Sequence, residues 1–146
     1  NGSTRLTNEL SLLEARIRDG WSAEATFAAL STTQVISRGF VPASMAIDAN
    51  TLRNGWGGTW AVAPDAWAGG ANETVGASFR LTASNVPTDV CVESVMRGAR
   101  HYLGIVVSNG ADNWVVTNIG QQPAVGTVTT ACTAPAGAVA IAWITN

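Results

Sequence analysis

The sequence contains no lysine, and charged residues make up only 12% of its 146 positions. Its eight cationic side chains are all arginine, they form no basic run, and the formal net charge is −2. Proteins that track a nucleic-acid backbone carry clustered basic side chains, so this composition argues against direct nucleic-acid binding. The charge content is well below the roughly 25% of a typical soluble domain. It favours a surface that contacts other proteins.

Histidine is almost absent as well, because His101 is the only one. A zinc site or a Ser-His-Asp triad therefore has too few ligands or bases, and the sequence contains no phosphate-binding loop and no His-Glu-x-x-His motif. We predict no catalytic residue, no metal site and no cofactor, although a pair of carboxylates that only the fold brings together stays open. His101 itself is expected at the surface or at a strand edge.

The sequence also lacks a long hydrophobic run. No apolar stretch approaches the roughly 20 residues that a membrane-spanning helix requires. Residues 113–146 carry no charged side chain, but threonine, asparagine, glycine and proline divide them into short apolar pieces, which indicate strands. With 47% hydrophobic residues, the chain is long enough for one domain, expected over residues 1–146, that buries about two thirds of its unfolded surface.

An amphipathic helix is predicted at the start of the chain. Large apolar side chains recur there with the spacing i, i+4, i+7 and i+11, which places them on one helical face. These side chains are Leu6, Leu10, Leu13 and Ile17. Asp19 and Gly20 provide a plausible end of the helix. If the whole set is buried against a sheet, it contributes roughly 6–12 kcal/mol before the entropy of ordering is subtracted.

The middle of the chain combines a second helix with turns and strands. Residues 26–38 show a looser helical pattern, and residues 54–58 form a turn because three of them are glycine. β-branched and alternating residues predict strands over 59–63 and 75–83. A loop is expected between them, over residues 64–72.

The rest of the chain combines one helix with strands. Pro87 suits the first turn of a helix that extends to about Ala99. The Asn-Gly pair at 109–110 predicts the turn of a hairpin. The strands expected here are residues 102–107, 114–118, 126–132 and 138–145. The order of elements predicts an α+β fold with a mostly antiparallel sheet.

The chain has two cysteines, Cys91 and Cys132, and no Cys-x-x-Cys motif. Two isolated cysteines that flank a long segment indicate one structural disulfide rather than a metal or redox site. In the chain-entropy model, a bridge that closes a loop of this length stabilises the fold by about 4 kcal/mol. We expect the bridge to form outside the cytoplasm and to tie the helix after Pro87 to the sheet.

Six tryptophans permit two interpretations. Indole rings exposed side by side could stack on sugars, which would make the chain a secreted carbohydrate-binding module rich in β-structure. The rings could instead fill a core that is otherwise built from small alanine and glycine residues, and this second interpretation is favoured. The tryptophans in or beside predicted strands are Trp56, Trp60, Trp114 and Trp143.

The order of these features resembles the soluble domain of type IV pilins of the b subclass. This subclass contains the toxin-coregulated pilins and the thin-pilus pilins of conjugative plasmids. The resemblance spans nearly the whole chain. It rests on the helix Leu6–Ile17, Phe40–Met45, Asn54–Gly58, Asn85–Pro87, Cys91, Cys132 and the apolar end of the chain up to Thr145.

The resemblance implies the type IV pilin fold, in which an N-terminal amphipathic helix packs on a mostly antiparallel sheet and a disulfide bounds the C-terminal region. It implies a structural subunit of an extracellular filament, for conjugative mating-pair attachment or adhesion, and not an enzyme. In such pilins a hydrophobic half-helix precedes the soluble domain and lies in the inner membrane before assembly. We expect that half-helix to be absent from this chain.

The partners implied by the resemblance are identical subunits. The inner-membrane assembly machinery and the prepilin peptidase would act on the full-length form. By the same resemblance, the helices over Thr32–Arg38 and Thr88–Ala99 meet neighbouring subunits. The candidate interface residues are Thr32, Gln34, Val35, Arg38, Glu93 and Arg97. A minor pilin, or a pseudopilin of a secretion system, is the alternative with the same fold.

Overall fold

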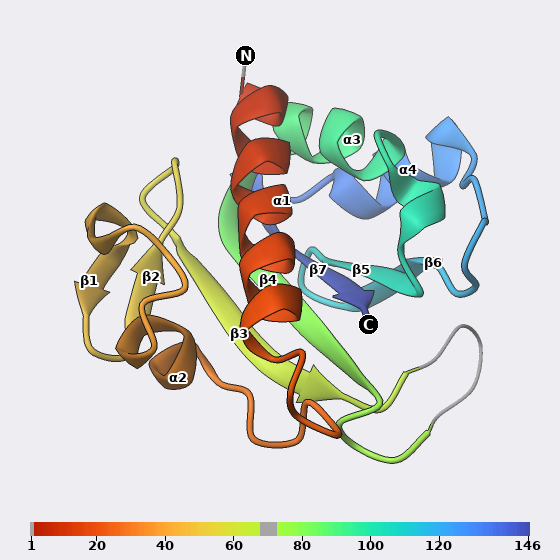
Figure 1. Cartoon of the computed structure of the whole chain (residues 1–146). Helices are drawn as coiled ribbons and strands as arrows, with labels where there is room; N and C mark the ends of the chain where they lie inside the picture. Colours follow the sequence, from red (N-terminus) through yellow and green to blue (C-terminus); the bar gives the residue numbers. More distant parts are fainter. Residues whose placement is uncertain (1, 68–72) are drawn as a thin grey trace.

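The computed structural model describes residues 2–67 and 73–146, which form helices and one sheet (Figure 1). The helices are α1 Gly2–Gly20, α2 Thr32–Ser37, α3 Thr88–Met96 and α4 Val125–Cys132, with 3-10 turns at Ala43–Met45 and Ala99–His101. The strands are β1 Ala46–Asp48, β2 Thr51–Arg53, β3 Thr59–Asp65, β4 Ser78–Pro87, β5 Gly104–Ser108, β6 Asp112–Val116 and β7 Ala138–Thr145.

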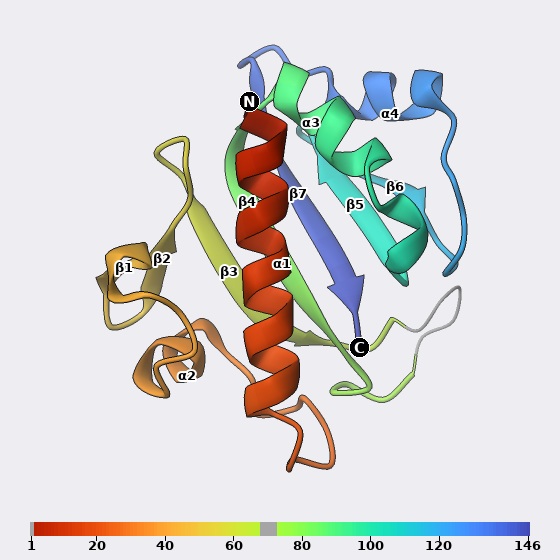
Figure 2. The same cartoon turned by 45° about the horizontal axis from the view of Figure 1, so that its top comes forward.

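The sheet has seven strands in the order β1-β2-β3-β4-β7-β5-β6. Each of the pairings between described strands is antiparallel. The last strand of the chain, β7, therefore lies between β4 and β5 in the middle of the sheet. Helices α1 and α3 cover one face, and α4 lies beside α3 at the end of the sheet (Figure 2). The predicted α+β fold with an antiparallel sheet is confirmed.

Helix α1 forms where the apolar stripe predicted it, and the stripe faces the sheet. The side chains of Leu6, Leu13 and Ile17 are fully buried, at 0% exposure. Leu10 is 3% exposed. Together they join the core cluster that includes side chains of β3, β4 and β7. The prediction of a core-facing helix is therefore confirmed over its whole length.

The second helix is shorter than the pattern over 26–38 indicated. It begins only at Thr32, because the hydroxyl of Ser31 caps it by accepting a hydrogen bond of 3.1 Å from the N–H three residues later. Before the cap, the N–H of Phe27 donates to the carbonyl of Gly76 over 2.8 Å, and its ring packs 4.8 Å from a ring of β4. These tertiary contacts override the local helical pattern.

The strands beside the predicted loop also differ from the prediction at their ends. β3 continues to Asp65, whose Oδ2 accepts a hydrogen bond of 2.8 Å from Nε of Arg80 in β4. β4 begins at Ser78 and extends to Pro87, which is the N-cap of α3 rather than a residue of its first turn. The part of the predicted loop at 68–72 lies outside the described residues.

The strand predicted over 126–132 is wrong, because this segment forms helix α4. Its threonines and valines favour a strand locally. However, its buried side chains, Val128, Ala131 and Cys132, have helical spacing. The hydroxyls of Thr129 and Thr130 donate to backbone carbonyls four residues earlier, over 2.7 and 3.0 Å. Burial of this face outweighs the local preference for a strand, since tertiary context overrides propensity.

Both edges of the sheet are poor templates for a further strand. β1 has only three residues, and its register with β2 is irregular. β6 is joined to β5 by the predicted Asn-Gly turn, but the register skips Val115 between Trp114 and Val116. Short edge strands and bulges disfavour pairing with another chain. Association through strand addition is therefore disfavoured at either edge.

Candidate functional site

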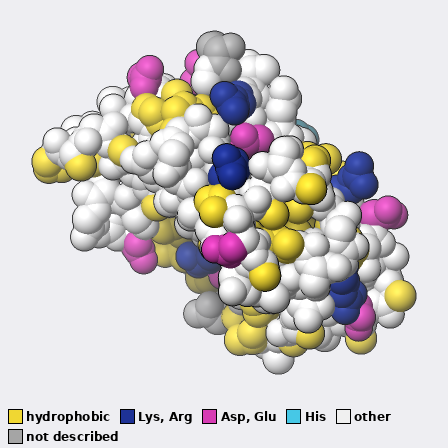
Figure 3. All heavy atoms as spheres, turned by 90° about the vertical axis from the view of Figure 1, so that its left-hand side faces the viewer, with side chains coloured by type: hydrophobic (Ala, Val, Ile, Leu, Met, Phe, Trp, Pro, Cys, Tyr) yellow, Lys and Arg dark blue, Asp and Glu magenta, His cyan; other side chains and the backbone are white. Residues whose placement is uncertain are grey.

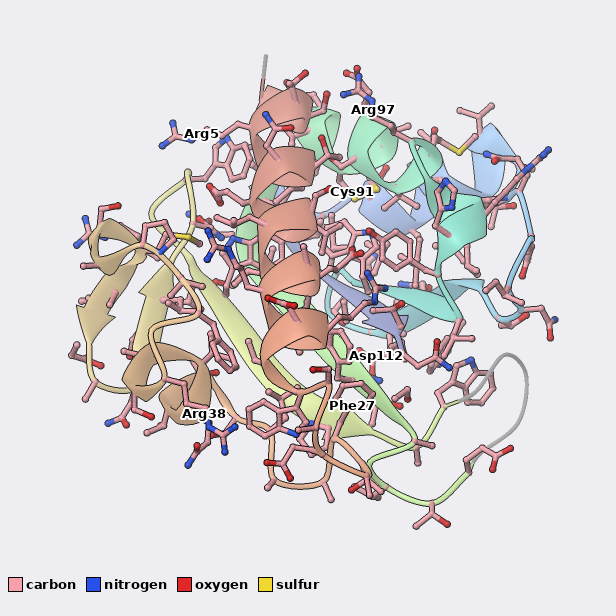
Figure 4. The ribbon with its side chains drawn as sticks, viewed as in Figure 1. Arg5, Phe27, Arg38, Cys91, Arg97 and Asp112 are labelled. Carbon is pink, nitrogen blue, oxygen red and sulfur yellow. A yellow bond between two sulfur atoms is a disulfide. The ribbon has the colours of Figure 1, made fainter. Side chains whose placement is uncertain are left out.

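The disulfide between Cys91 and Cys132 is present, with an S–S distance of 2.04 Å and a Cα–Cα distance of 5.9 Å. Both cysteines are buried, at 0% and 1% exposure. The prediction that the bridge ties a helix to the sheet is wrong, because Cys132 ends a helix and the bridge joins α3 to α4. The two helices are thereby held together at one end of the sheet (Figure 4).

Helix α3 offers a charged outer face to solvent. Its inner face buries Cys91 and Val95. On its outer face Glu93 and Arg97 form an ion pair of 2.7 Å, and their side chains are 48% and 47% exposed. Nη1 of Arg97 also lies 3.4 Å from the hydroxyl of Thr4 in α1. Both predicted interface residues are thus accessible, and Arg97, the C-cap of α3, lies near the N-terminal end of α1 (Figure 4).

Helix α2 presents fewer of its predicted interface residues. Val35 is 0% exposed and belongs to the core. Thr32 is partly engaged, since its hydroxyl accepts a hydrogen bond of 2.9 Å from the N–H of Val62. Gln34 accepts one of 3.1 Å from Arg38. Because Val35 is buried in the core, its side chain is unavailable to a neighbouring subunit. The prediction that Val35 is an interface residue is wrong.

Arg38 is the most accessible of the predicted residues near α2. Its guanidinium lies 4.2 Å from the ring centre of Trp21, and it forms an ion pair of 3.8 Å with Glu24. The structure does not bring α2 and α3 together, because α2 lies beside β2 and β3 while α3 lies on the other side of α1 (Figure 1). The two predicted interface helices therefore belong to different sides of the molecule.

Sequence analysis missed the exposed large apolar side chains. Ile47 in β1 is 52% exposed, and Ile119 and Val125, which follow β6, are 62% and 59% exposed. Figure 3 views the molecule from the side of β1 and shows hydrophobic side chains reaching the surface between scattered charged ones. Ile47 ends a short apolar run after Met45 and Ala46, and Ile119 and Val125 are single large apolar residues next to a glycine, so periodicity gave no signal. Only the strand order shows that they lie at opposite edges of the sheet.

The tryptophans divide between the core and the surface. Trp60 and Trp143 are 1% and 0% exposed, as the core interpretation predicted. Trp114 is 40% exposed, so the core interpretation is wrong for this ring. It packs against Trp67 with ring centres 4.6 Å apart and planes inclined by 37°. The two rings contact each other and do not form the coplanar platform of a sugar-binding module.

A polar network joins α1 to the end of β7. The hydroxyl of Tyr102 donates to Oε1 of Glu14, and Oε2 of Glu14 pairs with Arg18 over 3.3 Å. Arg18 in turn donates to the hydroxyl of Thr145 over 2.6 Å. Burial, followed by the negative charge of Glu14, raises the pKa of Tyr102 far above its usual value of 10.0. The network requires the neutral phenol as a hydrogen-bond donor.

Alkaline unfolding should therefore report on Tyr102. The chain has one tyrosine and no lysine, and both cysteines are bridged. Because the pKa of Tyr102 is raised in the folded state, the unfolded state loses the phenol proton first. The free energy of unfolding should be level just below pH ~10 and fall by up to about 1.4 kcal/mol per pH unit above it.

Denaturant titrations at several alkaline pH values, followed by tyrosinate absorbance, would measure this slope. Tyr102→Phe should abolish it. Tyrosinate that forms near pH ~10 in the still-folded protein would contradict the assignment.

The described residues show no metal-ligand cluster of three or more His, Cys, Asp or Glu side chains. His101 is exposed in a 3-10 turn, as expected. None of the helices within residues 2–67 and 73–146 is both long and apolar enough to cross a bilayer.

This chain has a helix packed along an antiparallel sheet and a disulfide-bounded region that leads into a central last strand. This combination defines the class of type IV pilins. A family model described as PilS N terminal matches residues 2–146. The chain belongs to this family.

Solved structures agree with this assignment. The chain is 26% identical to the type IV b pilin from Salmonella typhi in its crystal structure, with a TM-score of 0.66 and 96% of each chain covered. An NMR structure of the type IVb pilin PilS from Salmonella typhi is 25% identical, with a TM-score of 0.54, covering 100% of this chain and 96% of that one. TcpA, a type IV pilin from Vibrio cholerae El Tor biotype, shares the fold alone, at 14% identity, a TM-score of 0.68 and 99% coverage of each chain. The comparison with curated proteins found no match.

Proposed function

We propose that this pilin is the repeating subunit of an extracellular type IVb pilus and that different patches of its surface join neighbouring copies. Family membership and the similarity to the Salmonella typhi pilin support a structural subunit. The observation that carries the proposed mode of assembly is the position of exposed apolar side chains at both edges of the sheet.

The two apolar patches are not alike. One contains Ile47 on β1, and the other contains Ile119 and Val125 beyond β6. Single exposed apolar residues are common and need no explanation. A contact between two different patches, however, is heterologous, and it produces an open helical polymer when the rotation does not close. Side-by-side contact between these edges suits a filament better than strand addition, which both edges disfavour.

The accessible parts of the two interface helices fit the same two-sided arrangement. Gln34 and Arg38 lie on the side of β1, whereas Glu93 and Arg97 lie on the side of α3. Their side chains would supply polar contacts around the apolar patches, as the rim of a protein interface usually does. Val35 has no part in this proposal, because it is buried.

Ile47→Asp in the full-length protein should remove the pilin from sheared filaments, because a carboxylate would have to be buried against the neighbour. The melting temperature of the soluble domain should hardly change, since exposed positions tolerate substitution within about 0.5 kcal/mol. Val75→Asp is the matched control, because Val75 is 58% exposed and precedes the central strand β4. Normal filaments from Ile47→Asp, or equal loss from Val75→Asp, would contradict the assignment of the patches.

The full-length protein is proposed to continue upstream of α1 as a hydrophobic helix. This helix would hold the subunit in the inner membrane, where prepilin peptidase and the assembly machinery act on it. The N-terminal end of α1 lies at the periphery of the molecule, so an upstream helix could extend from it (Figure 1). The gene tests this proposal: a short basic leader, a glycine and about 25 apolar residues should precede the chain.

The proposed biological role is attachment, either between mating cells or to a surface, and the resemblance to thin-pilus pilins supports mating. A strain that lacks the pilin should lose plasmid transfer if the first role is correct and surface attachment if the second is. A minor pilin or pseudopilin would instead be scarce in filaments. Its abundance relative to other filament proteins separates these alternatives.

A further inference from the structure

Four exposed charges at the two edges of the sheet have no ion-pair partner within residues 2–67 and 73–146. Five of the eight arginines pair with a carboxylate at 4.0 Å or less, but Arg53 and Arg100 do not. Asp48 and Asp112 are likewise outside these five pairs, and all four residues are exposed. The other charged residues without an ion pair in the described part of the chain lie in α1, in α3 and in the loop before β4: Arg16, Asp19, Asp89 and Glu73.

The edge formed by β1 and β2 carries one charge of each sign. Asp48 ends β1 and Arg53 ends β2. Because the two strands are antiparallel, these charges lie at opposite ends of the edge. Oδ1 of Asp48 accepts a hydrogen bond of 2.8 Å from the N–H of Asn50. This bond holds the carboxylate next to the exposed Ile47 and leaves Oδ2 available to another molecule.

The edge at β6 also carries one charge of each sign. Asp112 begins β6, and its Oδ1 accepts a hydrogen bond of 2.6 Å from the hydroxyl of Ser108. Arg100 lies beside the segment that follows the other end of β6, because its carbonyl accepts a hydrogen bond of 3.0 Å from the N–H of Gly120. The exposed Ile119 is the neighbour of this glycine.

The order of the charges along the two edges is opposite. Six antiparallel pairings separate β1 from β6, so the two strands run in the same direction on opposite sides of the molecule (Figure 1). Where these strands begin, Arg53 lies on one edge and Asp112 on the other. Where they end, Asp48 lies on one edge and Arg100 on the other. Two copies that meet by these different edges therefore bring opposite charges together at both ends.

We propose that each edge is covered by a second copy of this chain and that the charges pair Asp48 with Arg100 and Arg53 with Asp112. The apolar patches next to the first pair would exclude water from it, which strengthens the attraction. The long arginine side chains can adjust to differences in spacing along the edges. The twist of the sheet inclines its edge strands, so neighbouring copies would be rotated, as in a helical polymer. This inference rests on the proposed filament subunit and adds the residues by which its copies recognise each other.

Contact between two like edges would also satisfy these charges. Turning one copy by 180° places its Asp48 against Arg53 of the other copy, and the reverse. Such a contact is isologous and closes into a dimer, so it does not extend a filament. Variants with reversed charges separate the two arrangements.

The experiment measures the full-length pilin in sheared filaments relative to the pilin that accumulates in the cell. Asp48→Arg or Arg100→Asp alone places like charges together, and each should reduce this filament fraction at least about tenfold. The double variant Asp48→Arg, Arg100→Asp should restore it to within about twofold of the unaltered protein. Reversal of both charges on one edge, Asp48→Arg with Arg53→Asp, should not restore it.

Glu73→Arg is the matched control for Asp48→Arg. Glu73 is exposed, belongs to none of the ion pairs in the described part of the chain, and precedes the central strand β4. This variant should leave the filament fraction unchanged. The melting temperatures of all the soluble variants should differ little from that of the unaltered domain, since exposed positions tolerate substitution.

The charge pairing and the proposed function can fail separately. If both single reversals leave the filaments intact while Ile47→Asp removes the pilin, the charge pairing is overturned and the proposed subunit stands. Failure of the double variant Asp48→Arg, Arg100→Asp to restore filaments also overturns the pairing. Rescue by Asp48→Arg with Arg53→Asp would assign the contact to two like edges and overturn it as well. Absence of the unaltered pilin from filaments would overturn both proposals.

Discussion

Leu13→Ala is expected to lower the free energy of unfolding of the soluble domain by about 2–5 kcal/mol. Leu13 is 0% exposed and lies at the centre of the stripe by which α1 packs on the sheet. Truncation removes buried methyl groups and leaves a cavity that the surrounding strands fill only in part. Leu10→Ala, one turn earlier on the same stripe, should have an effect in the same range. Denaturant unfolding followed by tryptophan fluorescence measures both.

Ser11→Ala is the matched control, because Ser11 is exposed on the opposite face of the same helix. Its effect should stay within about 0.5 kcal/mol. If Leu13→Ala cost no more than Ser11→Ala, α1 would not be packed on the sheet. The proposed subunit would then lack the rigid helix that its fold requires.

Loss of the disulfide is the second large effect. The double variant Cys91→Ala, Cys132→Ala is expected to lose about 4 kcal/mol, because the bridge closes a loop with a sequence separation of 41 residues. This is a large part of the ~5–15 kcal/mol by which a typical domain is stable. Helix α4 should be affected most, since its sequence favours a strand and the bridge to α3 holds it. We also expect the full-length variant to assemble poorly.

Reduction of the unaltered protein provides the control for the double variant. A strong reductant opens the bridge without changing the volume of the side chains, so its effect on the melting temperature should approach that of the double variant. The reductant should have no effect on the double variant itself. A melting temperature that is the same with and without reductant would show that the bridge contributes little to stability.

Elements whose pattern is complete within one segment could be predicted from the sequence. The stripe of α1 needs only its own four apolar residues, and the Asn-Gly turn between β5 and β6 needs only two residues. The pairing of Cys91 with Cys132 could be predicted because no other cysteine exists. The resemblance to type IV pilins then predicted how these elements are arranged in the fold.

Features that depend on contacts between segments could not be predicted in this way. Helix α4 has the composition of a strand, and packing makes it a helix. Trp114 and Trp143 occupy similar strand patterns, yet Trp143 lies on the face of the sheet that joins the core cluster, whereas Trp114, in register with Val106, lies on the opposite face, so one ring is buried and the other is exposed. Val35 was assigned to an interface because the resemblance to pilins placed the whole helix over 32–38 there, but the fold buries this side chain in the core.

The direct test of the proposed function is the composition of filaments sheared from cells that produce the full-length protein. We predict that this pilin is their main component and that Ile47→Asp removes it from the sheared fraction while the protein still accumulates in the cell. Filaments that contain only traces of this pilin, or filaments that form normally without it, would contradict its role as the repeating subunit.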